Sequence, residues 1–227
     1  MKLRLIVGLF LLFGVLSTQG QQIDVKEIEQ AVKNPESKFF YPALLKRFNS
    51  LDTTLKKEDF KHLYYGFAFR EDYIPFEMDD LEKRLKELNY AKRFEDVIDL
   101  ADSIDHLVPT DLTVLFEKSY ALRSLAKKEE VIARSKYNVL LKAVLASGDG
   151  KSPETAYLVI FFGDEIEVLS ALGLKIVERQ TILKDNRFYD VWILGKNKQK
   201  LEKIYFDVTI PHKFEEQELI KDLKDNN

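Results

Sequence analysis

Histidine and carboxylate side chains are the residues of this chain that could support metal or acid–base chemistry. The three histidines, His62, His106 and His212, lie on three separate segments, and no two have the i, i+4 spacing of a zinc-binding helix. Histidine is also favoured beside a helix C-terminus, which is where His106 is expected. The spacing therefore predicts no metal site.

Adjacent carboxylates are plentiful along the chain, and five of the pairs are candidates for acid–base chemistry. General acid–base catalysis needs two carboxylates in different environments, one of them with a raised pKa. These pairs instead fall at expected helix starts or on polar helix faces, where negative charge is favoured or solvated. We interpret all five as non-catalytic: Asp79-Asp80, Glu95-Asp96, Glu129-Glu130, Asp164-Glu165 and Glu215-Glu216.

Two further carboxylates, Glu178 and Asp190, lie on expected strands, where a side chain can point into a covered face. They are the only basis for an enzymatic hypothesis. The exposed elbow Gly-x-Ser-x-Gly of a serine nucleophile is absent from the sequence. Residues 147–152 lack the spacing of a phosphate-binding loop and follow an expected helix rather than a strand. The sequence predicts a protein that is not an enzyme and binds no cofactor.

Aromatic residues are concentrated in the segment 39–76, which holds 11 of them. One interpretation is a packed helix–helix seam, because rings recur at helical spacing from Phe60 onward. The other is a groove in which the exposed rings of Tyr65, Phe69 and Tyr73 stack on a peptide or a sugar. These three residues are the candidate binding residues of the sequence.

Composition limits the classes of partner. Apolar residues make up 45% and charged residues 32% of the 227 residues, as in an ordinary globular protein. The formal charge of −3 offers no dense basic patch, so the sequence predicts no nucleic-acid partner. The absence of cysteine removes disulfides, thiolate metal sites and cysteine nucleophiles together.

The N-terminus has the three zones of a secretory signal peptide. Lys2 and Arg4 are positive, residues 5–16 are apolar, and residues 17–20 are small or polar. The apolar run reaches only about 18 Å as a helix, well short of a hydrocarbon core of about 30 Å. We expect cleavage near Gln21, no membrane span afterwards, and an exported protein in the periplasm or outside the cell.

A step of 34 residues relates several features of the chain. It joins Val97-Ile98 to Val131-Ile132, and Pro75 to Pro109, and it is the period of tetratricopeptide helical hairpins. Departures such as Leu85, where that template has a glycine, make any repeat degenerate. We predict an antiparallel helical hairpin array over residues 21–147, with helices over 78–91, 94–107, 111–125 and 128–147.

A small sheet is expected behind the array. The turn-forming residues 148–154 predict a linker, residues 155–212 a small sheet domain, and residues 213–227 a charged tail. Periodicity predicts one helix, over 163–172, and strands over 156–162, 174–183, 188–194 and 203–210. The last strand alternates apolar and polar residues, which is typical of an outer, half-solvated strand. The predicted fold class is α+β with a mostly antiparallel sheet.

Four short stretches carry a resemblance to a known family. They are Tyr41-Pro42 followed by Leu44-Leu45, Asp52-Thr53-Thr54-Leu55, Leu63-Tyr64-Tyr65-Gly66-Phe67, and Asp72-Tyr73 followed by Pro75. The sequence resembles an uncharacterised domain-of-unknown-function family, number 4919, of exported Bacteroidetes proteins. The resemblance implies export in a bacterium with an outer membrane, and it brings no catalytic residue or ligand.

The sequence leaves two functional hypotheses of different classes. The first is a non-catalytic interaction module that binds a protein or peptide of the cell envelope, because helical hairpin arrays offer concave binding surfaces. The alternative is a small-molecule or glycan binder that uses the aromatic surface between residues 39 and 76.

Overall fold

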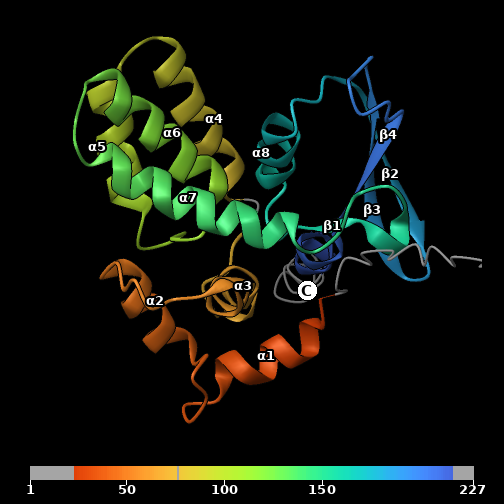
Figure 1. Cartoon of the computed structure of the whole chain (residues 1–227), viewed down its shortest axis with the longest axis horizontal. Helices are drawn as coiled ribbons and strands as arrows, with labels where there is room; N and C mark the ends of the chain where they lie inside the picture. Colours follow the sequence, from red (N-terminus) through yellow and green to blue (C-terminus); the bar gives the residue numbers. More distant parts are fainter. Residues whose placement is uncertain (1–22, 76, 217–227) are drawn as a thin grey trace, which may run out of the picture.

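The computed structural model describes residues 23–75 and 77–216 of the chain. The expected signal peptide and residues 217–227 of the expected tail lie outside this range. The described part is α+β, with a helical array followed by a four-stranded mixed sheet, as predicted (Figure 1). None of its helices is both long enough and apolar enough to cross a membrane.

The helical part begins with α1 (Val25–Lys33), α2 (Tyr41–Asn49), α3 (Lys57–Gly66) and the 3₁₀ turn η1 (Phe67–Phe69). It continues with α4 (Glu77–Tyr90), α5 (Phe94–Ile104), α6 (Leu112–Ser124) and α7 (Glu130–Leu145). The remaining elements are the 3₁₀ turn η2 (Pro153–Thr155), β1 (Tyr157–Leu158), α8 (Gly163–Ala171), β2 (Ile176–Lys184), β3 (Arg187–Leu194) and β4 (Lys203–Asp207).

Helices α4 to α7 form two antiparallel hairpins that pack side by side (Figure 1). Apolar side chains of α5 recur at helical spacing and are buried, from Val97 to Ile104. The turn after α4 and the turn after α6 each contain one non-glycine residue with positive φ, Lys92 (58°) and Ala126 (53°). These two positions are also 34 residues apart, so the hairpins turn in the same way.

Helix α3 lies at the centre of the N-terminal part and packs against α1, α2 and α7. Its side chains Leu63, Tyr64 and Tyr65, and Phe67 just beyond it, are fully buried. The helix begins at Lys57, where the Asp59 carboxylate accepts the Lys56 backbone N–H at 2.7 Å.

The sheet has the strand order β1-β4-β3-β2, with β1 parallel to β4 and the other neighbours antiparallel. The expectation that the last strand lies at the outside is wrong, because β4 is inserted between β1 and β3 and is buried from Ile204 to Asp207. The strand also ends at Asp207, and residues 209–216 are helical. The exposed outer strand is β2.

The turn-forming residues 148–154 are ordered and packed. The backbone N–H groups of Asp149 and Gly150 both donate to the Thr155 carbonyl, at 2.9 and 2.8 Å, and Tyr205 N–H donates to the Gly150 carbonyl at 2.8 Å. One apolar core runs from α1 to Val208 without a break. The predicted linker therefore marks the change from helices to sheet, while the packing continues across it.

Candidate functional site

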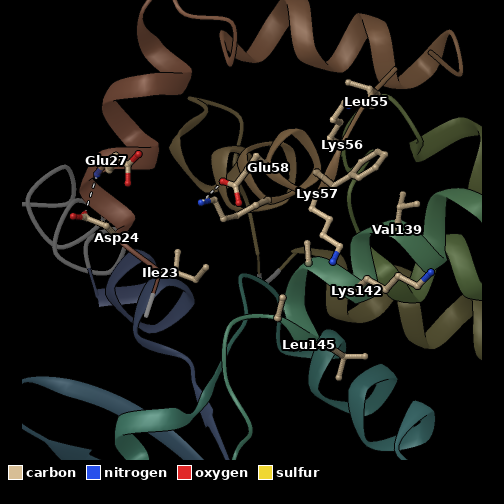
Figure 2. A pocket seen from close by; sticks show the side chains of 14 residues that line it. Ile23, Asp24, Glu27, Leu55, Lys56, Lys57, Glu58, Val139, Lys142 and Leu145 are labelled. Carbon is tan, nitrogen blue, oxygen red and sulfur yellow. Dashed lines mark hydrogen bonds and ion pairs between the residues drawn. The ribbon is translucent and has the colours of Figure 1, made fainter. Parts of the chain in front are cut away.

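An open groove of about 950 Å³ lies between α1, α3 and α7. We call it the α1–α3–α7 groove. Its wall is formed by the residues that precede and begin α1, the segment 55–61 at the start of α3, and the C-terminal half of α7 (Figure 2). The contacts of α3 with both α1 and α7 hold these three walls in place.

The floor of the groove is apolar and its rim is polar. Partly buried side chains of Ile23, Leu55, Phe60, Val139 and Leu145 line the floor. All five pack against the main core, which leaves one side of each facing the groove. The floor therefore offers apolar surface that a ligand could cover.

Three lysines of the rim, Lys56, Lys57 and Lys142, are exposed. In the part of the chain that the structure describes, none of them forms an ion pair. A fourth, Lys61, is paired with Glu58 at 2.5 Å. Figure 2 shows Lys57 extending from α3 toward α7, where Lys142 lies. The N-terminus of α3 also lies at this end of the groove, and the first backbone N–H groups of a helix favour negative charge. This end of the groove is suited to an anion.

The acidic side chains of the groove lie mainly at the α1 end. The Asp24 carboxylate caps α1, because its Oδ1 accepts the N–H groups of Lys26 and Glu27 at 3.0 Å each. The Glu27 side chain is exposed and forms no ion pair within the described residues. The groove is therefore polarised, with free positive charge beside α7 and free negative charge on α1.

Buried carboxylates form a second feature, where α8 packs against the array. We call Glu82, Asp111, Glu117, Asp164 and Glu167 the α8 acid cluster, and all five are buried. Figure 1 shows α8 between the array and the sheet, so the cluster lies at the junction of the two parts. Among the described residues, its only ion pair is Lys86 Nζ to Glu82 Oε2, at 3.5 Å.

Neutral hydrogen-bond donors surround the α8 acid cluster. Tyr64 Oη donates to Asp164, and the Leu112 N–H donates to the other Asp164 oxygen at 3.2 Å. Tyr137 Oη donates to Glu167 at 3.1 Å, and Asn89 Nδ2 donates to Glu117 Oε2 at 2.6 Å. Such bonds satisfy oxygens of Asp164, Glu167 and Glu117 but add no positive charge.

Burial raises the pKa of every member of the cluster. It is the largest cause at Glu82, whose pKa rises to about 9, with the neighbouring Asp111 charge adding to the effect. Burial, followed by the charge of Asp164, raises the pKa of Asp111 to about 7. Burial also raises the pKa of Glu167 to about 7. Near neutral pH, Glu82 is therefore mainly protonated, and Asp111 and Glu167 are each about half protonated.

A separate acidic pair lies between α8 and the sheet. The buried Glu165 carboxyl accepts the Trp192 Nε1–H, and burial followed by the charge of Asp190 raises its pKa. Asp190 Oδ1 accepts the Thr181 hydroxyl at 2.5 Å, and Arg179 Nη1 lies 3.5 Å from Asp190 Oδ2. Asp164 and Glu165 lie in the first turn of α8, as expected for a helix start, but both are buried because α8 is covered on both sides.

The strand carboxylates of the enzymatic hypothesis lie in different environments. Asp190 is buried, but its neighbour is Glu165, whereas Glu178 is exposed on β2 and accepts a hydrogen bond from Gln180 Nε2 at 3.0 Å. Neither residue, and no member of the α8 acid cluster, lines either of the two cavities described. No three potential ligands among the described histidines and carboxylates are placed to hold a metal ion.

The structure separates the three aromatic residues that were candidates for binding. Tyr65 and Tyr73 are 0% and 1% exposed, and their hydroxyls donate to the carbonyls of Leu158 and Ile160. Their rings pack in the core and hold the segment between β1 and α8, so the expectation that they are exposed is wrong. Phe69 is partly exposed, with Lys33 Nζ 5.8 Å from its ring centre.

The groove residues themselves were not singled out from the sequence. Lys56 and Lys57 begin one helix, and Lys142 lies more than 80 residues further on, so no local pattern joins them. Only the packing of α3 against α7 brings these charges to one surface.

Comparison with known proteins adds family membership and no ligand. No curated protein and no solved structure matches the chain significantly. A family model described as "Domain of unknown function (DUF4919)" matches residues 26–217, which includes the segment 41–75 that carries the resemblance. Because this match spans well over half of the sequence, the chain belongs to the DUF4919 family.

Proposed function

We propose that this protein is a non-catalytic binding protein whose α1–α3–α7 groove takes an acidic, amphipathic segment of another cell-envelope protein. The observation that carries the proposal is an apolar floor edged by three lysines that form no ion pair within residues 23–75 and 77–216. Apolar side chains of the segment would cover Leu55 and Phe60, while its carboxylates would meet Lys57 and Lys142. Burial of apolar area supplies affinity, and the charges set orientation and the rate of association.

The shape of the groove favours a polypeptide segment over a compact small molecule. Its volume of about 950 Å³ is at the upper end of the range for small-ligand pockets, and its walls come from three helices. The separation of charge along the groove would orient the bound segment, with its acidic end at α7 and its other end beside Glu27. The expected signal peptide and the family resemblance support an envelope partner.

Reversing two groove charges should weaken binding of such a segment by about 10- to 100-fold, which corresponds to about 1–3 kcal/mol. The variant is Lys57→Glu/Lys142→Glu, in which two attractive contacts become repulsive. A displayed library of random peptides would be selected for binding to the purified protein, produced without its expected signal peptide. We expect selected peptides to alternate carboxylates with apolar residues, and their affinity to fall at high salt.

The matched control is Lys127→Glu/Lys128→Glu, which makes the same charge change at two exposed lysines in the turn before α7. Its affinity for the selected peptides should equal that of the unaltered chain. Two results would count against the proposal: selected peptides without acidic residues, or equal binding to the groove variant and the control variant.

A further inference from the structure

Strand β2 is an open edge of the sheet. Among the described residues it pairs with β3 on one side only, and all nine of its residues are exposed. Two of its apolar side chains, Val177 and Leu183, are 67% and 63% exposed, and Ile176 and Ile182 are also exposed. An edge strand with free backbone N–H and C=O groups and apolar side chains is a template for pairing with another strand.

The charged side chains along this edge each contact a residue of their own chain, but Lys184 keeps further N–H donors and Glu178 keeps a second oxygen for another partner. Arg179 reaches the buried Asp190 carboxylate, and Lys184 Nζ donates to Glu154 Oε1 at 2.5 Å. One oxygen of Glu178 is occupied by the Gln180 side chain. A bulge at Val177, where the register to β3 shifts, limits the regular ladder to residues 178–184.

We propose that two copies of this chain associate through β2, antiparallel about a two-fold axis at Thr181, so that the two sheets join into one. Thr181 is the middle residue of the regular stretch 178–184. In this register Glu178 lies directly opposite Lys184 of the partner copy, and the same contact is repeated at the other end. Oppositely charged residues placed directly across two strands stabilise their pairing.

The remaining pairs of this register are also favourable. Thr181 meets Thr181 of the partner copy, and Leu183 lies across from the aliphatic part of Arg179 of the partner copy. On the other face of the sheet, Ile182 lies diagonal to Ile182 of the partner copy, within reach of apolar contact. A second copy is therefore the partner whose charges and apolar residues match this edge in register.

A charge swap tests this register without disturbing the core, because Glu178 and Lys184 are both exposed. Sedimentation or light scattering over a dilution series would give the dimer dissociation constant. We expect Glu178→Lys to raise it by about tenfold or more, since like charges then face each other twice. Glu178→Lys/Lys184→Glu restores both pairs and should return the constant to within about threefold of the original.

The matched control is Glu202→Lys, the same charge change at an exposed residue just before β4. It should leave the dissociation constant unchanged. The proposal would be overturned by a chain that stays monomeric at its highest soluble concentration, or by a double variant that associates no better than Glu178→Lys. Circular dichroism of every variant would establish that each is folded.

Because the chain has no cysteine, the register can also be read by cross-linking. Residues 180 and 182 of opposite copies face each other, so Gln180→Cys/Ile182→Cys should form covalent dimers on oxidation. In Gln180→Cys/Lys184→Cys the two thiols of opposite copies do not lie directly across from each other, so this variant should form few covalent dimers. Equal cross-linking of both variants would contradict this arrangement.

Discussion

Raising the pH from about 5 to about 8 should lower the free energy of unfolding of this protein by at least about 3 kcal/mol. The reason is the α8 acid cluster, whose carboxyls are buried with Lys86 as the one ion-pair partner among the described residues. The folded pKa of Asp111, about 7, lies above its unfolded value of 3.8. This contribution to stability is therefore complete below about pH 4 and is lost as the pH rises through 7.

The other titratable groups with shifted pKa values do not reverse this loss of stability between pH 5 and 8. The pKa of Glu82 is raised to about 9, so its contribution is still being lost above pH 8. Burial lowers the pKa of His62, which adds stability as the pH rises toward 6.5, but one histidine opposes several carboxyls. The lowered pKa of Asp52, about 2, affects stability only in strong acid.

Denaturant unfolding at several pH values would measure this dependence. Asp111→Asn/Glu82→Gln keeps the shape of the protonated acids and cannot ionise, so it should flatten the pH dependence and be the more stable form at pH 8. Asn is also a good N-cap, which preserves the bond from the Val114 N–H. The control Glu95→Gln/Asp99→Asn changes exposed acids and should keep the original dependence. Stability that is constant or rises from pH 5 to 8 would contradict the account.

Gly148→Ala should destabilise the fold by about 3 kcal/mol, a large effect for the addition of one methyl group. A Cβ atom at this position would lie 2.2 Å from the Thr155 carbonyl oxygen and 2.6 Å from that of Ala156. Both are backbone atoms, and the Thr155 oxygen also accepts the N–H groups of Asp149 and Gly150. The methyl group cannot be accommodated without moving the junction between α7 and β1.

Thermal or denaturant unfolding of this variant would be compared with Gly195→Ala. There the nearest atom to the added Cβ is 3.6 Å away, an ordinary contact, and we expect a change below about 1 kcal/mol. If residues 148–154 acted as a loose linker, both variants would be equally stable. That outcome would contradict the packed junction described above.

The helical array was predictable because each helix and turn is specified by residues that are close together in the sequence. Buried positions of α5 recur at helical spacing and the two hairpin turns lie 34 residues apart, so periodicity alone places α4 to α7 within a few residues. The position of β4 was not predictable in this way. Its residues Tyr205 and Asp207 look like a solvated face, but Tyr205 packs with Tyr189, and Asp207 pairs with Arg187.

The candidate site was harder to predict than the fold, because its residues come from distant segments. Lys57 and Lys142 meet only through packing of α3 on α7. The carboxylates of α8 look like a helix start in sequence, and only the array and the sheet on its two sides bury them. Tyr65 and Tyr73 lie off the helical seam in sequence, yet β1 and the residues that follow it cover them. Local patterns do not encode such long-range coverage.

The most direct test of the central proposal is photo-cross-linking from the groove in the cell that makes this protein. A photoreactive amino acid at position 142 should cross-link to an acidic, amphipathic segment of one envelope protein, and Lys57→Glu should abolish the product. The same group at position 127, outside the groove, should give no such product. Cross-links of equal yield from both positions, or a product that Lys57→Glu leaves unchanged, would contradict a binding function for this groove.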